Sequence, residues 1–308
     1  MAAPTTDEAG VRRCIVCDAR APFPTYFSWS RYRLARCECG LVFRDPQPDD
    51  SEFEDSGYYQ DETFSEALLG ELRETTMFNA RRKVVLLRDA GVNLDGARVL
   101  DVGASSGAWL EVATAQGCHA TGVELGATTA AAARERGLDV RTGTLDDALG
   151  LLGDERFDLI TFWDVLEHLR DPRHELALAR GLLKPGGRLA MTFPNVEGLY
   201  PQLTYRLLAR RTGVWEYPEV PHLYDFSPRT TQRLLAGSGY AVERVQTYAT
   251  PYGFYRSTSL SPGRTGRGRR GKLIRATFDA VHKVAYPLAR ATNRGNSMFV
   301  LARPDQGS

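Results

Sequence analysis

Four cysteines within the first forty residues have the spacing of metal ligands. They form the pairs Cys14-x-x-Cys17 and Cys37-x-Cys39, and Gly40 follows the second pair. Two close pairs separated by a loop are typical of a Cys₄ zinc site, and such a closed set of thiolates is structural. Two incidental thiol pairs are the alternative. We predict a structural Zn²⁺ bound by these four cysteines.

A glycine-rich turn in the middle of the chain could hold a cofactor. The apolar run over residues 98–102 predicts a buried strand, Gly103-x-Ser105-x-Gly107 predicts a tight turn, and residues 108–115 predict a helix. In this arrangement backbone N–H groups face a ligand. A plain turn between a strand and a helix is the alternative.

An acid one strand further on supports the cofactor hypothesis. Glu124 ends the apolar run over residues 120–124. An acid about twenty residues after the turn can accept hydrogen bonds from both hydroxyls of a ribose. Nicotinamide dinucleotide sites use the same acid, so Glu124 alone does not identify the cofactor. An exposed glutamate at a strand end is the alternative.

Acids and histidines later in the chain could supply acid–base chemistry. Asp164, Glu167 and His168 follow the apolar run over residues 157–162 at i, i+3 and i+4, which is one face of a helix. Packing and helix capping are the simpler interpretation of Glu167 and His168. His222 lies further along the chain, and an imidazole suits the removal of a hydroxyl proton. A solvent-exposed histidine is the alternative there.

These residues need a sheet and its helices to bring them together. Apolar runs predict strands over residues 98–102, 120–124, 138–141, 157–162, 188–193, 240–248 and 296–302. Helices are expected over residues 62–90, 108–115, 126–136 and 273–291. The apolar faces of the first and last helices are formed by Leu68, Leu69, Leu72, Phe78, Val84, Val85 and Leu87, and by Leu273, Ile274, Phe278, Val281, Val284 and Leu288.

Composition limits the class of protein. The chain has 308 residues, a formal net charge of +1, 43% hydrophobic residues and 25% charged residues, as a soluble globular protein does. The first thirteen residues contain no apolar core of the kind found in signal peptides. No uninterrupted apolar run is long enough to cross a membrane. We therefore expect a cytoplasmic protein whose thiols stay reduced, which favours a metal over disulfides.

Several segments resemble motifs of the class I S-adenosylmethionine (SAM) methyltransferases. Asp101-x-Gly103-x-Ser105-x-Gly107 resembles their motif D-x-G-x-G-x-G, with Ser105 in place of the middle glycine. Further similar segments are D-V-L-E-H-L at 164–169, L-x-P-G-G at 183–187, C-G-L-V-F-x-x-P-x-P at 39–48 and H-L-Y-x-F-S-P at 222–228. The segment at 39–48 is similar to one that follows an N-terminal zinc site in methyltransferases acting on sugars, glycans and specialised metabolites.

The resemblance implies an α/β, Rossmann-like fold with a small N-terminal zinc-binding module. Its seven-stranded sheet has the order 3-2-1-4-5-7-6, with the seventh strand antiparallel. The expected divisions are a zinc-binding module at 1–48, a helical lid or linker at 49–95, and a SAM-binding domain at 96–308 with insertions at about 194–222 and 250–292.

The resemblance also implies which residues bind the cofactor. The glycine turn holds the methionine end of SAM, Glu124 holds the ribose, and the loop after the third strand borders the adenine. The backbone near Phe162 and Trp163 lines the sulfonium. The expected set is Asp101, Gly103, Ala104, Ser105, Gly107, Glu124, Leu125, Thr144, Leu145, Asp146, Phe162 and Trp163.

Three residues are candidates for catalysis. We expect His222 to act as the base, and His168 and Tyr58 are further candidates. Tyr58 belongs to the lid region, where simple packing is an equal alternative. In ubiquinone-pathway O-methyltransferases a similar acid, acid and histidine set binds a divalent ion. Mg²⁺ at Asp164, Glu167 and His168 is therefore a secondary hypothesis.

The function that the resemblance implies is methyl transfer from SAM to a small molecule. O-methylation of a sugar or specialised metabolite is preferred, C-methylation of a nucleotide-linked sugar is the alternative, and N-methylation stays open. A zinc-containing nucleic-acid-binding protein with a vestigial Rossmann domain is less consistent with the near-neutral charge. A nicotinamide-dependent oxidoreductase would need G-x-G-x-x-G. The basic loop and helix over 256–291 could weakly contact an anionic substrate or a membrane surface. The sequence does not indicate the oligomeric state.

Overall fold

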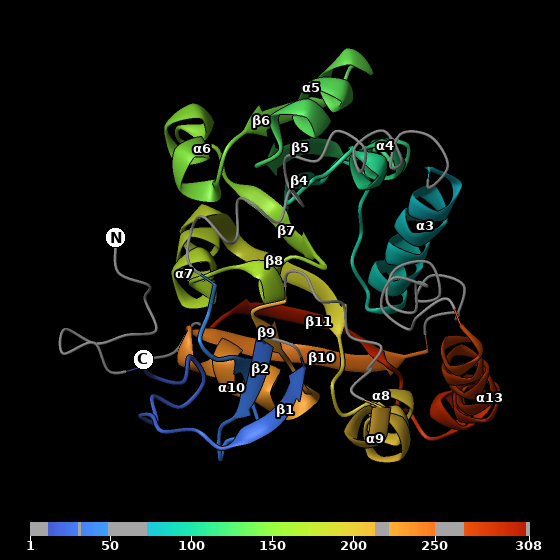
Figure 1. The fold of residues 1–308 in the computed structure, drawn as a ribbon. Coiled ribbons are helices and arrows are strands. Elements are labelled where there is room, and N and C mark those ends of the chain that lie inside the picture. Colours follow the sequence, from blue (N-terminus) through green and yellow to red (C-terminus); the bar gives the residue numbers. More distant parts are fainter. Residues whose placement is uncertain (1–11, 30–31, 49–72, 213–221, 250–267, 306–308) are drawn as a thin grey trace.

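Two β-sheets organise the molecule in a computed structural model of the chain (Figure 1). The structure describes residues 12–29, 32–48, 73–212, 222–249 and 268–305. Within these ranges, no helix combines the length and the apolar character needed to cross a membrane.

The larger sheet has seven strands. They are β4 (Arg98–Val102), β5 (His119–Glu124), β6 (Asp139–Thr142), β7 (Phe157–Trp163), β8 (Leu183–Pro194), β10 (Tyr240–Tyr248) and β11 (Ser297–Pro304). Their spatial order is β10-β11-β8-β7-β4-β5-β6, and β11 runs antiparallel between β8 and β10. Numbered by their appearance in the chain, these strands have the order 3-2-1-4-5-7-6, which confirms the predicted topology and fold class.

Helices cover both faces of this sheet. They are α3 (Arg73–Asp89), α4 (Ala108–Thr114), α5 (Ala127–Glu135), α6 (Leu145–Leu152), α7 (Pro172–Leu182) and α10 (Pro228–Gly237). Successive strand residues point to opposite faces, so Leu159 packs in the cluster with α3 and α4 while Ile160 packs with α6, α7 and α10. The strands are therefore apolar on both faces, as in other parallel sheets.

The buried face of α3 differs from the prediction. Phe78 and Val85 are 52% and 53% exposed, whereas Ala80, Val84 and Leu87 are buried. The buried residues follow the i, i+4, i+7 spacing of one helical stripe, and Phe78 and Val85 lie off that stripe. The expectation that these two residues contribute to a buried face is therefore wrong. The predicted residues 62–72 of this helix lie outside the described ranges.

The Pro-Gly-Gly segment at 185–187 forms an irregularity inside β8. Phe157 pairs with Leu183 and Leu159 pairs with Arg188, so the residues between the two pairs in β8 are looped out. A Cβ atom on Gly187 would lie 2.9 Å from the carbonyl oxygen of Phe157, so a side chain has no room there. The strand thus begins earlier than the predicted residue 188.

A smaller antiparallel sheet contains the N-terminal residues. Its strands are β1 (Thr25–Trp29), β2 (Tyr32–Arg36), β3 (Val42–Arg44) and β9 (Tyr224–Asp225). The short strand β9 follows His222 in the chain and pairs with β3. Cys14, Phe43 and Tyr224 belong to the same hydrophobic cluster as residues of the large sheet. The N-terminal sheet and the large sheet therefore share one core.

Two helical insertions pack against each other at one end of the large sheet. They comprise α8 (Leu199–Thr204), the π-helical turn η2 (Tyr205–Ala209) and α9 (Arg210–Thr212) in the first, and α13 (Arg269–Ala291) in the second. Tyr200 of α8 packs with Ile274, Phe278 and Ala285 of α13. Figure 1 shows these helices side by side below the sheet.

The predicted apolar face of α13 is only partly correct. Ile274 and Phe278 are buried as expected, but Leu273, Val284 and Leu288 are exposed. The buried stripe instead continues through small or polar residues, namely Gly271, His282, Ala285 and Ala289. Because α13 lies close to α8, small side chains occupy part of its contact face.

Candidate functional site

The glycine loop after β4 is fixed to the neighbouring strand β5. The backbone N–H groups of Gly103 and Ala104 donate to the carbonyl oxygen of Val123 at 2.8 and 3.0 Å. Gly103 has a φ of +76°, and a Cβ atom there would lie 2.5 Å from the side chain of Val165. A side chain at Gly103 would therefore be strained and would clash.

Ser105 adopts the backbone conformation that the resemblance assigns to a glycine. Its φ is +49°, in the left-handed region that side chains disfavour. Gly107, two residues later, has a φ of +78°. The loop therefore keeps the geometry of a three-glycine turn although its middle residue is serine.

The Glu124 carboxylate connects this loop to the start of α5. Its Oε2 accepts a hydrogen bond from the N–H of Ser105 at 2.6 Å, and its Oε1 accepts one from the N–H of Gly126 at 2.7 Å. Burial raises the pKa of Glu124, and the two N–H donors oppose that effect. The Thr129 hydroxyl also donates to Oε1, at 3.5 Å, so Oε2 is the oxygen that keeps an open acceptor position. Leu125, the next residue, is 50% exposed and offers an apolar surface beside it.

Asp101 lies in the core below the loop. Its Oδ1 accepts a hydrogen bond from the Thr161 hydroxyl at 2.6 Å. Burial raises the pKa of Asp101 to about 7, although the positive charge of Lys83 opposes this shift. The Lys83 Nζ lies 5.1 Å from the centre of the Trp163 ring. No sequence motif indicates Lys83, because its position depends on how α3 packs on the sheet.

The residues expected around the adenine lie at the start of α6. Thr144 caps this helix and accepts a hydrogen bond from the N–H of Asp147. The Leu145 side chain is buried, so only its backbone N–H, in the first turn of the helix, could face a ligand. Asp146 is exposed, and its Oδ2 lies 2.6 Å from Nε2 of His174.

The side chains of Phe162 and Trp163 belong to the core. Phe162 is fully buried, and the Trp163 ring packs edge-on against Trp109 at 5.2 Å between ring centres. Only the backbone of these two residues could therefore line a cofactor.

His222 lies between two acids and beside a second histidine. Its Nε2 is 3.9 Å from Oε1 of Glu167, and its Nδ1 is 3.8 Å from Oδ1 of Asp225. The ring centres of His222 and His168 are 4.8 Å apart. The His222 side chain is only 14% exposed, so the alternative of a solvent-exposed histidine is wrong.

Burial dominates the electrostatics of the acids in this cluster. It raises the pKa of Glu167 well above its ordinary value, and the negative charges of Asp164 and Asp225 add to the shift. Burial also raises the pKa of Asp225, while His222 opposes the effect. Both carboxyls therefore keep a proton to a higher pH than an ordinary carboxyl group does. Sequence analysis missed Asp225, although its spacing of three residues from His222 was a possible signal.

The group of potential metal ligands in this cluster differs from the expected one. Glu167, His168 and His222 have ligand atoms within 4.8 Å of one another, whereas Asp164 is exposed and lies outside this group. Mg²⁺ prefers an octahedron of oxygen ligands, and two imidazole nitrogens suit zinc or another transition metal better. The group that the structure brings together therefore does not suit Mg²⁺, and Mg²⁺ at Asp164, Glu167 and His168 stays a prediction.

The four N-terminal cysteines lie together as the spacing predicted. The Cys14 and Cys39 Sγ atoms are 3.6 Å apart, and those of Cys17 and Cys37 are 3.5 Å apart. All four Sγ atoms lie within 4.8 Å of one another, and none forms a disulfide. Four thiolates around Zn²⁺ at 2.3 Å would be about 3.8 Å apart. The thiols present therefore fit a tetrahedral zinc site.

Some predicted features lie outside the described residues. They are Tyr58, residues 49–72 of the predicted lid or linker, and residues 213–221 and 250–267 of the two predicted insertions. Their expected roles stay predictions.

An open α/β sheet with a glycine loop and an acid at the next strand end defines a Rossmann-like cofactor-binding domain. A family model described as a methyltransferase domain matches residues 73–245, which is more than half of the chain. The chain therefore belongs to this family of SAM-dependent methyltransferases.

Individual relatives cover a smaller part of the chain. The ubiquinone biosynthesis O-methyltransferase of Xylella fastidiosa (strain M23) is 38% identical over 112 residues, which are 34% of this chain and 44% of the relative. The protein of the same name from Stutzerimonas stutzeri (strain A1501) is 30% identical over 112 residues, 35% of this chain and 48% of the relative. The chain thus spans about half the length of these curated relatives.

One solved structure supports the fold. It is a chain of the complex between the Haloferax volcanii Trm112 methyltransferase activator and a methyltransferase. Its TM-score is 0.53 at 15% identity, and the match covers 80% of this chain and 98% of that one. This likeness concerns the fold alone.

Proposed function

We propose that this protein transfers the methyl group of SAM to a hydroxyl oxygen of a small molecule. The observation that carries the proposal is the Glu124 carboxylate, which holds the loop at Ser105 through Oε2 and keeps acceptor capacity on that oxygen for the ribose. The half-exposed Leu125 provides an apolar surface for a base next to the ribose. When bound, SAM supplies an electrophilic methyl group on a sulfonium.

His222 is the base in this proposal, and Asp225 positions it. Asp225 faces Nδ1 of the ring, so Nε2 is the atom that accepts the hydroxyl proton of the acceptor. Methyl transfer from a sulfonium removes a charge, so the reaction depends on alignment and exclusion of water more than on strong acids. The partial burial of His222 and His168 suits these needs.

An oxygen acceptor is supported by the names of the relatives. Both aligned relatives are called ubiquinone biosynthesis O-methyltransferase. The zinc-module resemblance supports a sugar or a specialised metabolite as the acceptor. A cytoplasmic location and the lack of a nucleic-acid partner stay predictions.

The four cysteines bind a structural Zn²⁺ in this proposal. Their Sγ positions fit a tetrahedral site. The site is next to α7, because Arg173 of that helix donates to the Ile15 carbonyl at 2.5 Å and pairs with Asp18 at 3.0 Å. The metal would thus fix the N-terminal sheet whose fourth strand, β9, carries Asp225.

Transfer of a labelled methyl group from SAM tests the proposal. We expect labelled product from a panel of phenols and sugars, carrying an acid-stable methyl ether, and no product with the variant Glu124→Ala. Methylation of only amines or carbon atoms in a panel containing all three acceptor types would contradict O-methylation. Absence of SAM binding would contradict the function as a whole.

A further inference from the structure

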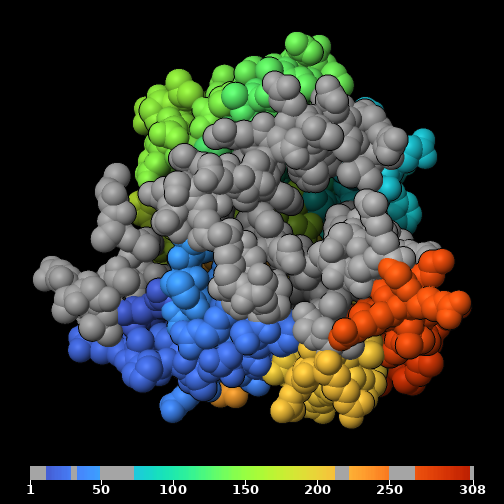
Figure 2. Space-filling view, in the orientation of Figure 1, coloured from blue at the N-terminus to red at the C-terminus, as the bar shows by residue number. Residues whose placement is uncertain are grey.

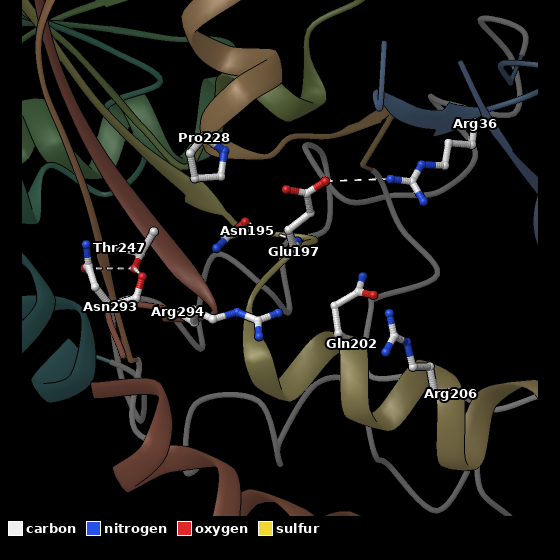
Figure 3. Close-up of a pocket in the computed structure, with 9 residues that line it drawn as sticks. All are labelled: Arg36, Asn195, Glu197, Gln202, Arg206, Pro228, Thr247, Asn293 and Arg294. Atoms are coloured by element: carbon white, nitrogen blue, oxygen red, sulfur yellow. Dashed lines mark hydrogen bonds and ion pairs between the residues drawn. The ribbon is translucent and has the colours of Figure 1, made fainter. Parts of the chain in front are cut away.

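A polar cavity lies between the N-terminal sheet and the first helical insertion. It has a volume of about 390 Å³, and three arginines from different elements line it (Figure 3). Arg36 ends β2, Arg206 belongs to η2, and Arg294 precedes β11. In Figure 3 the side chains of Arg294 and Gln202 extend into the space between the end of β8 and the helix α8.

The residues that line this cavity carry more positive than negative charge. Glu197 pairs with Arg36 at 3.7 Å. In the part of the chain that the structure describes, no carboxylate forms an ion pair with Arg206 or Arg294. Three guanidinium groups and one carboxylate therefore leave a net charge of two positive units. Guanidinium groups bind phosphates through paired N–H donors.

Neighbouring contacts hold the cavity walls in place. Asn195 is buried, and its amide donates to the Gly295 carbonyl at 2.8 Å while its oxygen accepts from the N–H of Glu197 at 3.1 Å. The Gln202 amide donates to the Val196 carbonyl at 2.8 Å. These bonds fix the segment after β8 before any ligand arrives, which lowers the entropic cost of binding.

Aromatic rings fix the opposite wall. The ring of Tyr205 stacks on that of Tyr26 at 4.5 Å between ring centres, with 10° between the ring planes. The guanidinium of Arg36 lies over the Tyr26 ring at 5.6 Å. Figure 2 shows the N-terminal sheet, in blue, bordering α8 and α9, in yellow, on this face of the molecule. Arg36 and Arg206 are thus carried by two elements that pack together.

The cavity lies on the acceptor side of the proposed active site. Asn195 follows the carboxyl end of β8, which is parallel to β7 and β4, and the glycine loop follows the carboxyl end of β4. Open α/β sheets bind their ligands along this edge. The glycine loop and the cavity therefore share one edge, with β7 and β8 beyond β4 on the cavity side.

We infer that this cavity binds a phosphate group of the acceptor, so that the substrate is a phosphate ester. That the bound compound is the methyl acceptor rests on the proposed function, whereas binding of an anion in the cavity does not. The guanidinium groups of Arg206 and Arg294, which have no ion-pair partner among the described residues, match the charge of a phosphate dianion. The volume of the cavity also leaves room for the organic part of the ester, since small-molecule sites occupy about 300 to 1,000 Å³.

Calorimetric titration of the full, metal-loaded chain in the presence of S-adenosylhomocysteine (SAH) tests the inference. The probes are glucose 1-phosphate, glucose and inorganic phosphate. We expect glucose 1-phosphate to bind and glucose not to bind. Arg206→Gln and Arg294→Gln should each weaken glucose 1-phosphate binding about 10- to 100-fold, the usual effect of losing a hydrogen bond to a charged group. The matched control Arg210→Gln, in α9 outside the cavity, should change it less than about twofold.

Three results would overturn the inference. The first is no binding of either phosphate probe at 10 mM, a concentration about ten times a Kd of 1 mM. The second is an equal affinity for glucose 1-phosphate in the two cavity variants and the control variant. The third is arginine-dependent binding of inorganic phosphate with exclusion of glucose 1-phosphate, which would indicate a site for the free ion. If the wild-type chain bound glucose 1-phosphate but did not bind SAH, the proposed function would be contradicted and the anion site would stand.

Discussion

The backbone N–H of Ser105 donates a hydrogen bond to the side-chain carboxylate of Glu124 at 2.6 Å. This bond joins the loop after β4 to the end of β5, the two elements that the proposed cofactor must contact together. Ser105 makes the bond from a left-handed conformation with a φ of +49°. The backbone of Ser105, rather than its hydroxyl, is therefore the group that organises the loop.

The variant Ser105→Gly should keep the site and relieve strain. A left-handed conformation costs a residue with a side chain about 1 to 2 kcal/mol, and glycine loses about 0.5 to 1 kcal/mol through greater freedom in the unfolded chain. We expect the free energy of unfolding to rise by up to about 1.5 kcal/mol in urea denaturation, and the Kd for SAH to change less than about twofold. Ser106→Gly is the control, and it should destabilise the protein, because Ser106 is not in the left-handed region. A large loss of SAH affinity in Ser105→Gly would mean that the hydroxyl itself binds the cofactor.

Asp101 should make stability depend on pH. Its pKa is about 7 in the folded protein and about 3.9 in the unfolded chain. Between these values the folded state keeps a proton that the unfolded state has lost, so the free energy of unfolding falls as pH rises from about 4 to 7, by up to about 4 kcal/mol. Urea denaturation at several pH values should show a smaller fall for Asp101→Asn, which can still accept the Thr161 hydrogen bond. If the free energy of unfolding depended on pH equally in the wild type and in Asp101→Asn, Asp101 would not be the group responsible.

The cysteine cluster should bind one zinc ion per chain. Elemental analysis of Cys37→Ser should show loss of the metal, and the variant should unfold at a lower temperature, because the N-terminal sheet loses its fixed connection to α7. Cys118→Ala is the matched control, since Cys118 is buried and donates to the Leu94 carbonyl outside the cluster. Full zinc content in Cys37→Ser would refute the site.

His222 and Asp225 should affect turnover without affecting cofactor binding. Loss of a general base reduces kcat about 10²- to 10⁴-fold, so we expect this fall for His222→Asn with an unchanged Kd for SAH. Asp225→Asn should lower kcat about tenfold and change the shape of the kcat–pH profile, as expected for a residue that positions the base. A normal kcat in His222→Asn would exclude this histidine as the base.

The large sheet could be predicted because each strand is an apolar run of its own. Gly103 and Glu124 lie where the strand ends place them, so their proximity also follows from the sequence. The pairing of β9 with β3 could not be predicted, because Tyr224–Asp225 is too short for a periodic signal. His222 and Asp225 are only three residues apart, but their contact depends on the backbone conformation between them, so sequence analysis found the histidine and missed its partner.

The insertions show a second limit of the sequence. Leu288 and Val284 were expected on the apolar face of α13, but the helix buries Ala285 and Ala289 instead. Hydrophobicity alone does not reveal that a close helix contact requires small residues. The cavity with Arg36 and Arg206 was missed for a related reason, because these residues come together only through the packing of β2 against η2.

Calorimetric titration of the metal-loaded wild-type chain with SAH is the measurement on which the proposed site depends. We expect one SAH to bind per chain, and we expect Glu124→Ala to weaken that binding at least about 100-fold, since it removes both the acceptor for the ribose and the partner of the loop N–H. No heat with either SAM or SAH, or binding of NAD alone, would contradict the cofactor site described above.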